Sequence, residues 1–222
     1  MRREVKLNYY DNSWPLTLTN SPCDLHLVQY LELKGYEQKL IFHFGTGEHH
    51  LVGKRNHERG DPNEIIAVTA SREEYEAYVD FIIDNPRAAN YYKVFFADIY
   101  TLSARMLPKF DIVTLFHLCE YYDQQRYDRK PAIDNDGGLS AGETAERETR
   151  VNSAYARLDD VKVLEMFLSK LNPGGNILFF TKSGAYDRHN SKAGAIVKDF
   201  IYRKRMIVED EYESLLICGR PW

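Results

Sequence analysis

Short apolar runs alternate with stretches of helical periodicity along most of this 222-residue chain. The apolar runs occupy residues 39–45, 64–69, 92–97, 110–116 and 176–181. Apolar residues recur every three or four positions, the spacing typical of an amphipathic helix, in residues 21–33, 71–84, 161–171 and 191–204. Such alternation predicts a parallel sheet that is covered by helices on both faces.

Two further β-like segments, residues 206–208 and 214–218, close the chain. Only a few residues separate them, too few for a crossover helix, so these two strands are expected to be antiparallel. We therefore predict an α/β fold with a doubly wound, mostly parallel seven-stranded sheet, helices on both faces and an antiparallel C-terminal strand pair.

The length of the chain fits a single domain that spans residues 1–222. Residues 1–36 are predicted to form an N-terminal helical extension, in which Ser21 caps a helix that Gly35 ends. Residues 124–150 contain proline, glycine and polar residues with almost no apolar content. We expect a flexible loop or lid there, because long loops within compact domains tend to be functional or disordered.

Charge and cysteine content exclude several classes of protein. The formal net charge of −4 gives no overall attraction to nucleic acid, and the basic run at residues 202–205 is interpreted as the solvated end of a helix. The three cysteines are far apart, which indicates reduced thiols rather than a zinc site. The first residues lack the apolar run that is typical of a signal peptide, and no stretch of the sequence approaches ~20 consecutive apolar residues. The sequence therefore predicts a cytoplasmic protein that binds neither nucleic acid nor a membrane.

Two glycines follow the first apolar run, in the sequence Phe-Gly-Thr-Gly-Glu at residues 44–48. In a doubly wound sheet, ligands bind beyond the carboxyl ends of the strands, where glycine allows a tight turn and a close approach of the backbone. The same glycines would equally suit a strand-to-helix turn without a ligand. His50 occupies the third glycine position of the G-x-G-x-x-G dinucleotide fingerprint, which argues against a nicotinamide enzyme.

Several segments together resemble the class I, S-adenosylmethionine-dependent methyltransferases. The similar segments follow one another in the order and at the spacings of that family, and they are residues 41–47, 68–71, 97–99, 110–117 and 171–178. The antiparallel C-terminal pair fits the last two strands of the family. The resemblance covers about residues 20–220.

The resemblance implies S-adenosylmethionine as the cofactor, bound by His43, Gly45, Thr46, Gly47, Thr69, Asp98, Ile99 and Phe116. The glycines would pass beneath the amino-acid end of the cofactor. Position 69 would hold the ribose hydroxyls, Asp98 would hydrogen-bond the adenine amino group, and Ile99 would lie against the adenine ring.

Two of these positions depart from the family pattern, because the family usually has acidic residues where His43 and Thr69 stand. A carboxylate accepts two ribose hydroxyls at once, and losing one such bond costs about 1.5–3 kcal/mol, or on the order of ten- to a hundredfold in affinity. Three alternatives follow. The domain binds S-adenosylmethionine weakly, or a neighbour such as Glu48 supplies the missing carboxylate, or the domain no longer methylates. If the site is real but weakened, Thr69→Asp should tighten binding.

Methyl transfer needs little acid–base chemistry from the protein, because the sulfonium is already activated. A general base helps when the acceptor is a hydroxyl or an amine, and the resemblance places Phe116 and His117 along the approach to the methyl group. His117 and Glu120 are the candidate catalytic residues. The predicted function is methylation of a small-molecule acceptor, and the alternative is an inactive methyltransferase-like domain that serves as a binding subunit. The sequence leaves open whether the chain forms a homodimer.

A metal site is not expected from the histidines near the glycine segment. His49 and His50 are adjacent, so on a helix they would point about 100° apart. The zincin pattern of two histidines four residues apart is absent.

Overall fold

The computed structural model describes residues 23–47, 49–60, 62–118, 160–180 and 192–220. The predicted helix cap at Ser21, the segment 124–150, and the side chains of Glu48 and Glu120 lie outside these residues. Within the described ranges, no helix is both long and apolar enough to cross a bilayer.

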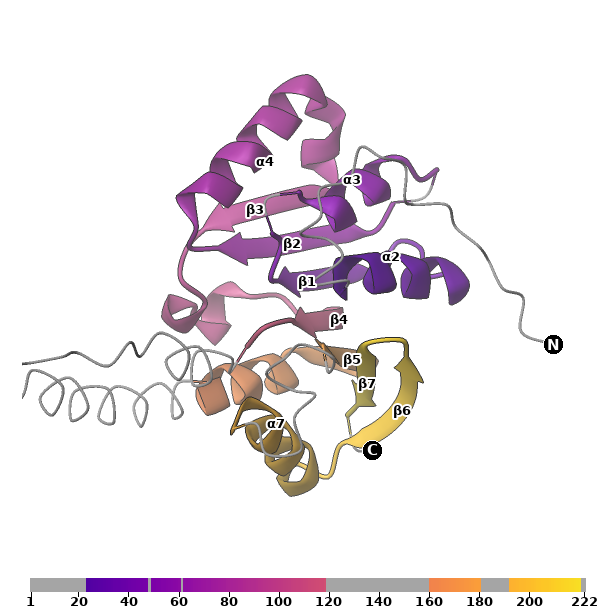
Figure 1. Ribbon diagram of the computed structural model, residues 1–222, viewed down its shortest axis with the longest axis vertical. Coiled ribbons are helices and arrows are strands. Elements are labelled where there is room, and N and C mark those ends of the chain that lie inside the picture. Colours follow the sequence, from indigo (N-terminus) through magenta and orange to yellow (C-terminus); the bar gives the residue numbers. More distant parts are fainter. Residues whose placement is uncertain (1–22, 48, 61, 119–159, 181–191, 221–222) are drawn as a thin grey trace, which may run out of the picture.

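In the described part of the chain, seven strands form one sheet (Figure 1). They are β1 (Leu40–Phe44), β2 (Glu64–Thr69), β3 (Tyr92–Phe96), β4 (Phe110–Leu115), β5 (Leu171–Phe180), β6 (Ile207–Tyr212) and β7 (Leu215–Gly219). Their spatial order is β3-β2-β1-β4-β5-β7-β6. Strands β1 to β5 pair in parallel, and β7 is antiparallel to both β5 and β6. The predicted fold class is confirmed, and the strand order reverses between β1 and β4.

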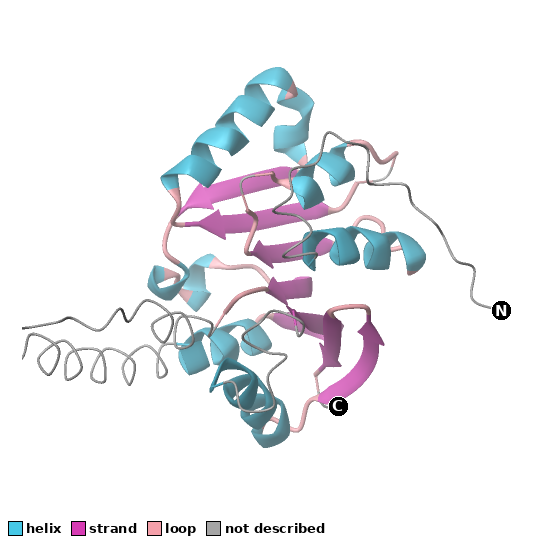
Figure 2. Ribbon diagram, viewed as in Figure 1, coloured by secondary structure: helices cyan, strands magenta, loops and turns pink. Residues whose placement is uncertain are grey.

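Helices cover both faces of the sheet (Figure 2). On one face lie α2 (Cys23–Leu33), α3 (Leu51–His57) and α4 (Arg72–Asp84). The helical residues 160–169 and α7 (Lys192–Arg203) cover the other face. Three short 3-10 turns complete the described connections, namely η1 (Pro86–Asn90), η2 (Ile99–Thr101) and η3 (Ala104–Met106).

The two helical layers explain why the central strands read as continuous apolar runs. Neighbouring residues of a strand point to opposite faces, so a strand that is covered on both faces must be apolar throughout. Ile41 of β1 packs in the cluster that contains Leu27 of α2. The next residue, Phe42, packs against Phe167 with ring centroids 4.2 Å apart. Both strand residues are fully buried.

Strand β5 begins at Leu171, five residues before the predicted start at Asn176. Leu171 pairs with Phe110 and Asn176 pairs with Ile112, so the extra residues form an irregularity within the strand. A Cβ at Gly175 would lie 2.9 Å from the carbonyl oxygen of Asp111. The glycine therefore permits a close backbone approach inside β5, where the sequence pattern had indicated a break.

Candidate functional site

The carboxyl ends of β1, β2, β3 and β4 lie side by side at one edge of the sheet. Phe44 of β1 is in register with Val68 of β2 and with Leu115 of β4. The backbone N–H of Ala97, just after β3, donates to the carbonyl of Thr69 (2.9 Å). The fold therefore brings together the strand-end segments that the sequence analysis singled out, which are residues 45–47, 69, 98–99 and 116–117.

The glycine segment after β1 depends on a conformation that suits glycine. Gly45 has a φ of +96° and Gly47 a φ of +57°, values that residues with a Cβ rarely adopt. A Cβ at Gly45 would also lie 3.1 Å from the Cβ and 3.2 Å from the carbonyl oxygen of Phe116. Gly45 thus lets the turn after β1 lie directly against the end of β4.

A carboxylate that the sequence analysis did not assign to the site lies between the glycine segment and the end of β2. The Thr46 hydroxyl donates to Oε2 of Glu74 at 3.0 Å, and the Thr69 hydroxyl donates to the same oxygen at 2.6 Å. Both threonines are buried, with exposed fractions of 1% and 4%. Glu74 lies in the first turn of α4, and no hydrogen bond joins its Oε1 to another described residue.

The turn between β2 and α4 explains why the Glu74 side chain points to the threonines. Ser71 caps α4, because its hydroxyl accepts from the Glu74 backbone N–H (3.2 Å). In a full capping box the glutamate would accept from the Ser71 backbone N–H. That N–H instead donates to the Thr69 hydroxyl oxygen (3.0 Å). The carboxylate is therefore released from the cap and accepts from Thr69.

His50, at the third position of the incomplete glycine fingerprint, is a buried structural residue. It precedes α3 with a φ of 49°. Its Nδ1 lies 2.7 Å from the Tyr92 hydroxyl, and its Nε2 lies 2.6 Å from the Glu74 carbonyl oxygen. Because a carbonyl can only accept, Nε2 carries the proton and Nδ1 accepts from the tyrosine. His50 thus fixes the first turn of α4, and burial lowers its pKa.

The described residues hold no group of three or more histidine, cysteine or acidic side chains arranged for a metal ion. Both nitrogens of the His50 ring are already engaged within the protein.

His43, two residues before Gly45 on β1, is a buried and neutral side chain. Its Nδ1 lies 2.6 Å from the hydroxyl of Thr114 on β4, and its exposed fraction is 1%. Burial, with a smaller contribution from the nearby His50, lowers the pKa of His43 from 6.5 to about 3. The ring therefore carries no charge near neutral pH.

An acidic side chain reaches this position from another element. Asp24, in the first turn of α2, places its Oδ1 3.5 Å from Nε2 of His43. Neither atom has a hydrogen-bond partner among the described residues. Burial, and then the charge of Glu74, raise the pKa of Asp24 well above its usual 3.8. The helix that covers β1 thus places an acidic side chain beside His43.

The three other predicted cofactor contacts, Asp98, Ile99 and Phe116, differ in their exposure to solvent. Asp98 is exposed at the edge of the sheet, and its Oδ1 accepts from the backbone N–H of Tyr100 (3.0 Å). Ile99, with an exposed fraction of 3%, packs in the hydrophobic core. Phe116 is fully buried, with its ring centroid 5.7 Å from that of His43. Asp98 is therefore the one of these three whose side chain is open to solvent.

His117 stands two residues after the end of β4 and adopts a φ of 60°. Its ring packs 5.3 Å from the ring of Phe180, and its Nε2 lies 3.7 Å from the sulfur of Cys23. The residue thus lies at the carboxyl edge, beside the N-terminus of α2. Of the two candidate catalytic residues, only His117 lies within the described part of the chain.

Comparisons with known proteins bear on the fold. No protein-family model matches the sequence, and no curated protein matches it significantly. Magnesium protoporphyrin IX methyltransferase (ChlM) from Synechocystis PCC 6803, solved with bound SAM, aligns with a TM-score of 0.56 and 11% identity over 96% of this chain and 88% of that one. Precorrin-6y C5,15-methyltransferase from Geobacter metallireducens GS-15 aligns with a TM-score of 0.52 and 11% identity, over 89% and 88%.

TrmN from Thermus thermophilus aligns with a TM-score of 0.52 and 13% identity over 88% of this chain and 48% of that one. This chain therefore spans about half the length of that protein. At identities this low, structural similarity establishes the fold alone. The fold, with its strand order and final antiparallel pair, is that of the class I methyltransferases.

Proposed function

We propose that this chain binds S-adenosylmethionine and transfers its methyl group to a small-molecule acceptor. The observation that carries the proposal is the Glu74 carboxylate, which two threonine hydroxyls hold between the glycine segment and the end of β2. This is where the methyltransferase resemblance puts a carboxylate that accepts the ribose hydroxyls. Glu74 supplies the group that Thr69 lacks.

The geometry of Glu74 suits this role because only one of its oxygens is used within the described protein. Thr46 and Thr69 both donate to Oε2. Oε1 is left to accept hydroxyl groups of a ligand, in charge-assisted bonds that are roughly twice as strong as neutral ones. The threonines also fix the carboxylate in place before a ligand arrives, which lowers the entropic cost of binding.

Asp24 lies beside His43, which stands two residues before Gly45, and a cationic ligand group there would favour the charged form of its carboxyl. The amino-acid end of S-adenosylmethionine carries an ammonium group, and the resemblance places that end above Gly45 and Gly47. A carboxylate that is buried and lacks a hydrogen-bond donor gains most from a cationic partner. We assign Asp24, in place of the residue at position 43, to the ammonium group.

S-adenosylmethionine, when bound, supplies a methyl group that is already activated by its sulfonium. The chain's own task is then to orient the acceptor and to hold or move its proton. His117 stands two residues after the end of β4, with its Nε2 3.7 Å from the sulfur of Cys23. We assign it as the base for a hydroxyl or amine acceptor.

The second candidate is a methyltransferase-like domain without catalysis. The neutral, fully buried His43 favours it, because the family's strand carboxylate is absent at that position. Titration with S-adenosylmethionine and S-adenosylhomocysteine by calorimetry separates the two candidates. Micromolar binding supports the enzyme, and no binding at millimolar ligand supports the inactive domain.

Glu74→Gln tests the assignment of the site. The amide keeps the size of the side chain but removes its charge, so we expect on the order of ten- to a hundredfold weaker binding of both ligands. Glu73→Gln is the matched control, since this neighbour is exposed and its carboxylate accepts from Ser71 at 3.0 Å. Equal affinities of the two variants would remove Glu74 from the site.

The structure reverses the expectation for Thr69→Asp. An aspartate at position 69 would face the Glu74 carboxylate at the place where Thr69 now donates over 2.6 Å. Two carboxylates at that distance repel each other or share a proton. Thr69→Asp should therefore weaken binding, and only the double variant Thr69→Asp with Glu74→Gln should recover it.

A further inference from the structure

Helix α4 leaves much of its apolar surface open. It has 13 residues, and none of them is buried. Tyr75, Tyr78 and Phe81 pack against the core beneath the helix. Tyr75, Val79 and Ile83 follow one another at a spacing of four residues and form a second apolar stripe, in which Val79 is 37% and Ile83 68% exposed. Val79 and Ile83 have no partner among the described elements that buries them.

The outer strand of the sheet extends the same apolar surface. Strand β3 is the edge strand next to β2 in the described sheet. Its last residue, Phe96, is 56% exposed and lies with its ring centroid 5.6 Å from that of Tyr75. An exposed edge strand with large apolar side chains is a feature that proteins usually cover or blunt.

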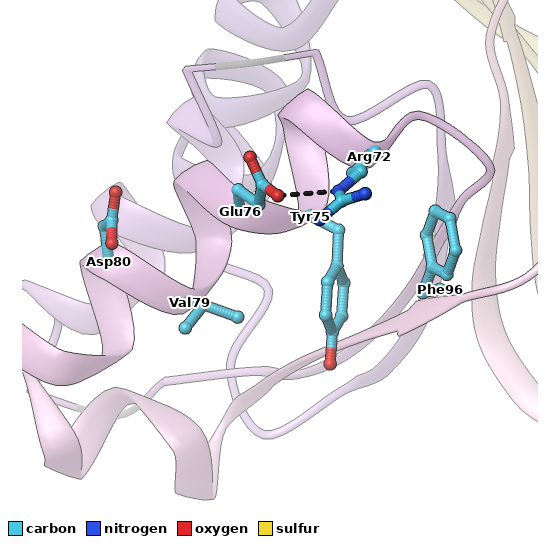
Figure 3. A pocket seen from close by; sticks show the side chains of 6 residues that line it. All are labelled: Arg72, Tyr75, Glu76, Val79, Asp80 and Phe96. Atoms are coloured by element: carbon cyan, nitrogen blue, oxygen red, sulfur yellow. Dashed lines mark hydrogen bonds and ion pairs between the residues drawn. The ribbon is translucent and has the colours of Figure 1, made fainter.

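Tyr75 and Val79 of the stripe and Phe96 at the end of β3 line an open groove of about 410 Å³. Its apolar residues are Tyr75, Val79 and Phe96, and its polar wall is formed by Arg72, Glu76 and Asp80 (Figure 3). We call this the α4–β3 groove.

The wall of the α4–β3 groove is acidic. Two of its lining side chains are carboxylates, Glu76 and Asp80, and one is an arginine, so the lining carries a formal charge of −1. The arginine, Arg72, is paired with Glu76 at 2.8 Å. Asp80 has no ion pair with a described residue. An incoming chain thus meets an apolar floor and unpaired negative charge.

We propose that the α4–β3 groove docks a basic amphipathic helix of a partner protein. Apolar residues at a spacing of three or four on that helix would cover Tyr75, Val79 and Phe96, and lysine or arginine on its flank would face Asp80. A second copy of this chain does not suit the groove, since two α4 helices would bring their carboxylates together. Nucleic acid is disfavoured for the same reason.

The probe is a synthetic, fluorescein-labelled helix of about 18 residues with a leucine stripe flanked by lysines, and its scrambled sequence serves as the reference peptide. Binding to the full chain is measured by fluorescence anisotropy. Val79→Ser removes part of the floor, and Asp80→Lys reverses the charge of the wall. Val208→Ser and Glu211→Lys make the same changes on β6, the opposite edge strand, where Val208 is 48% exposed.

We expect the amphipathic peptide to bind at least about tenfold more tightly than the scrambled one, and each groove variant to lose about tenfold. The β6 variants should bind like the wild type, and all four should keep the wild-type melting temperature, since the changes are on the surface. Equal binding of the two peptides, or equal losses from the groove and β6 variants, would overturn the proposal. A wild-type dimer that Val79→Ser dissociates, seen by sedimentation, would also overturn it by making this face a self-interface.

Discussion

Acidification should destabilise this protein through His43. The folded protein holds this ring neutral with a pKa of about 3, whereas the ordinary value is 6.5. Below pH 6.5 the unfolded chain therefore binds a proton that the folded protein does not accept. The sign follows from linkage: stability is complete above pH 6.5 and is lost progressively as the pH falls towards 3.

The size of the effect follows from the width of this window. One pKa unit corresponds to about 1.36 kcal/mol, so moving from pH 7 to pH 4 should cost about 3 kcal/mol through His43 alone. Domains are stable by only about 5–15 kcal/mol. In a chain of this length 1 kcal/mol shifts the melting temperature by about 2–4 °C, so a fall of about 10 °C is expected.

The titration of Asp24 changes the stability in the opposite direction to that of His43. Its contribution must therefore be removed before the effect of His43 is measured. Its pKa is raised in the folded protein, so the unfolded chain alone loses the proton as the pH rises above 3.8. Its contribution to stability therefore increases as the pH falls, which offsets part of the loss from His43. Asp24→Asn removes this titration and keeps the shape of the side chain.

The assay compares Asp24→Asn with the double variant Asp24→Asn, His43→Gln. Glutamine keeps a group that bonds the Thr114 hydroxyl and does not titrate. Thermal unfolding followed by circular dichroism at pH 7, 5 and 4 should show the histidine form losing about 3 kcal/mol relative to the glutamine form. His49→Gln, in the turn before α3, is the control. Parallel losses in both forms would refute a buried, neutral His43.

Two further predictions concern the glycine segment. His50→Gly completes the glycine fingerprint, but it removes the hydrogen-bond partner of the buried Tyr92 hydroxyl. The free energy of unfolding, measured in urea, should therefore fall by about 2 kcal/mol. An increase would contradict the structural role of the His50 ring. Gly47→Ala should cost about 1–2 kcal/mol for its positive φ. Gly45→Ala should cost more, because its Cβ would also press on Phe116, and equal losses would contradict that contact.

Most of the fold follows from the order of apolar runs, but its irregular parts do not. The parallel strands and the antiparallel pair are where the pattern puts them, because burial on both faces leaves a continuous apolar signal. Helix α3 has seven residues and too few apolar positions to show a helical period. The early start of β5 at Leu171 depends on a shift in register against β4, which no local pattern records.

The candidate site was predictable in its backbone but not in its side chains. Strand ends and glycines locate the carboxyl edge, whereas the sequence shows Glu74 only as one polar residue of a predicted helix. Its carboxylate turns away because the Ser71 backbone N–H bonds the Thr69 hydroxyl instead. Asp24 reaches His43 only because α2 packs on β1, a contact between elements that the sequence does not specify.

The positions of these two acids favour a ligand-binding edge over an inert scaffold. A buried carboxylate without a hydrogen-bond donor, as at Asp24, costs stability that an asparagine or leucine would restore. The neutral His43 beside it adds a liability in acid. Such costs are typical of functional sites, where side chains are arranged for a ligand rather than for the folded chain alone. Asp24 and His43 both lie at the edge of the sheet where Glu74 keeps one oxygen open. A ligand bound there would give the Asp24 carboxyl a partner and would also hydrogen-bond the open oxygen of Glu74.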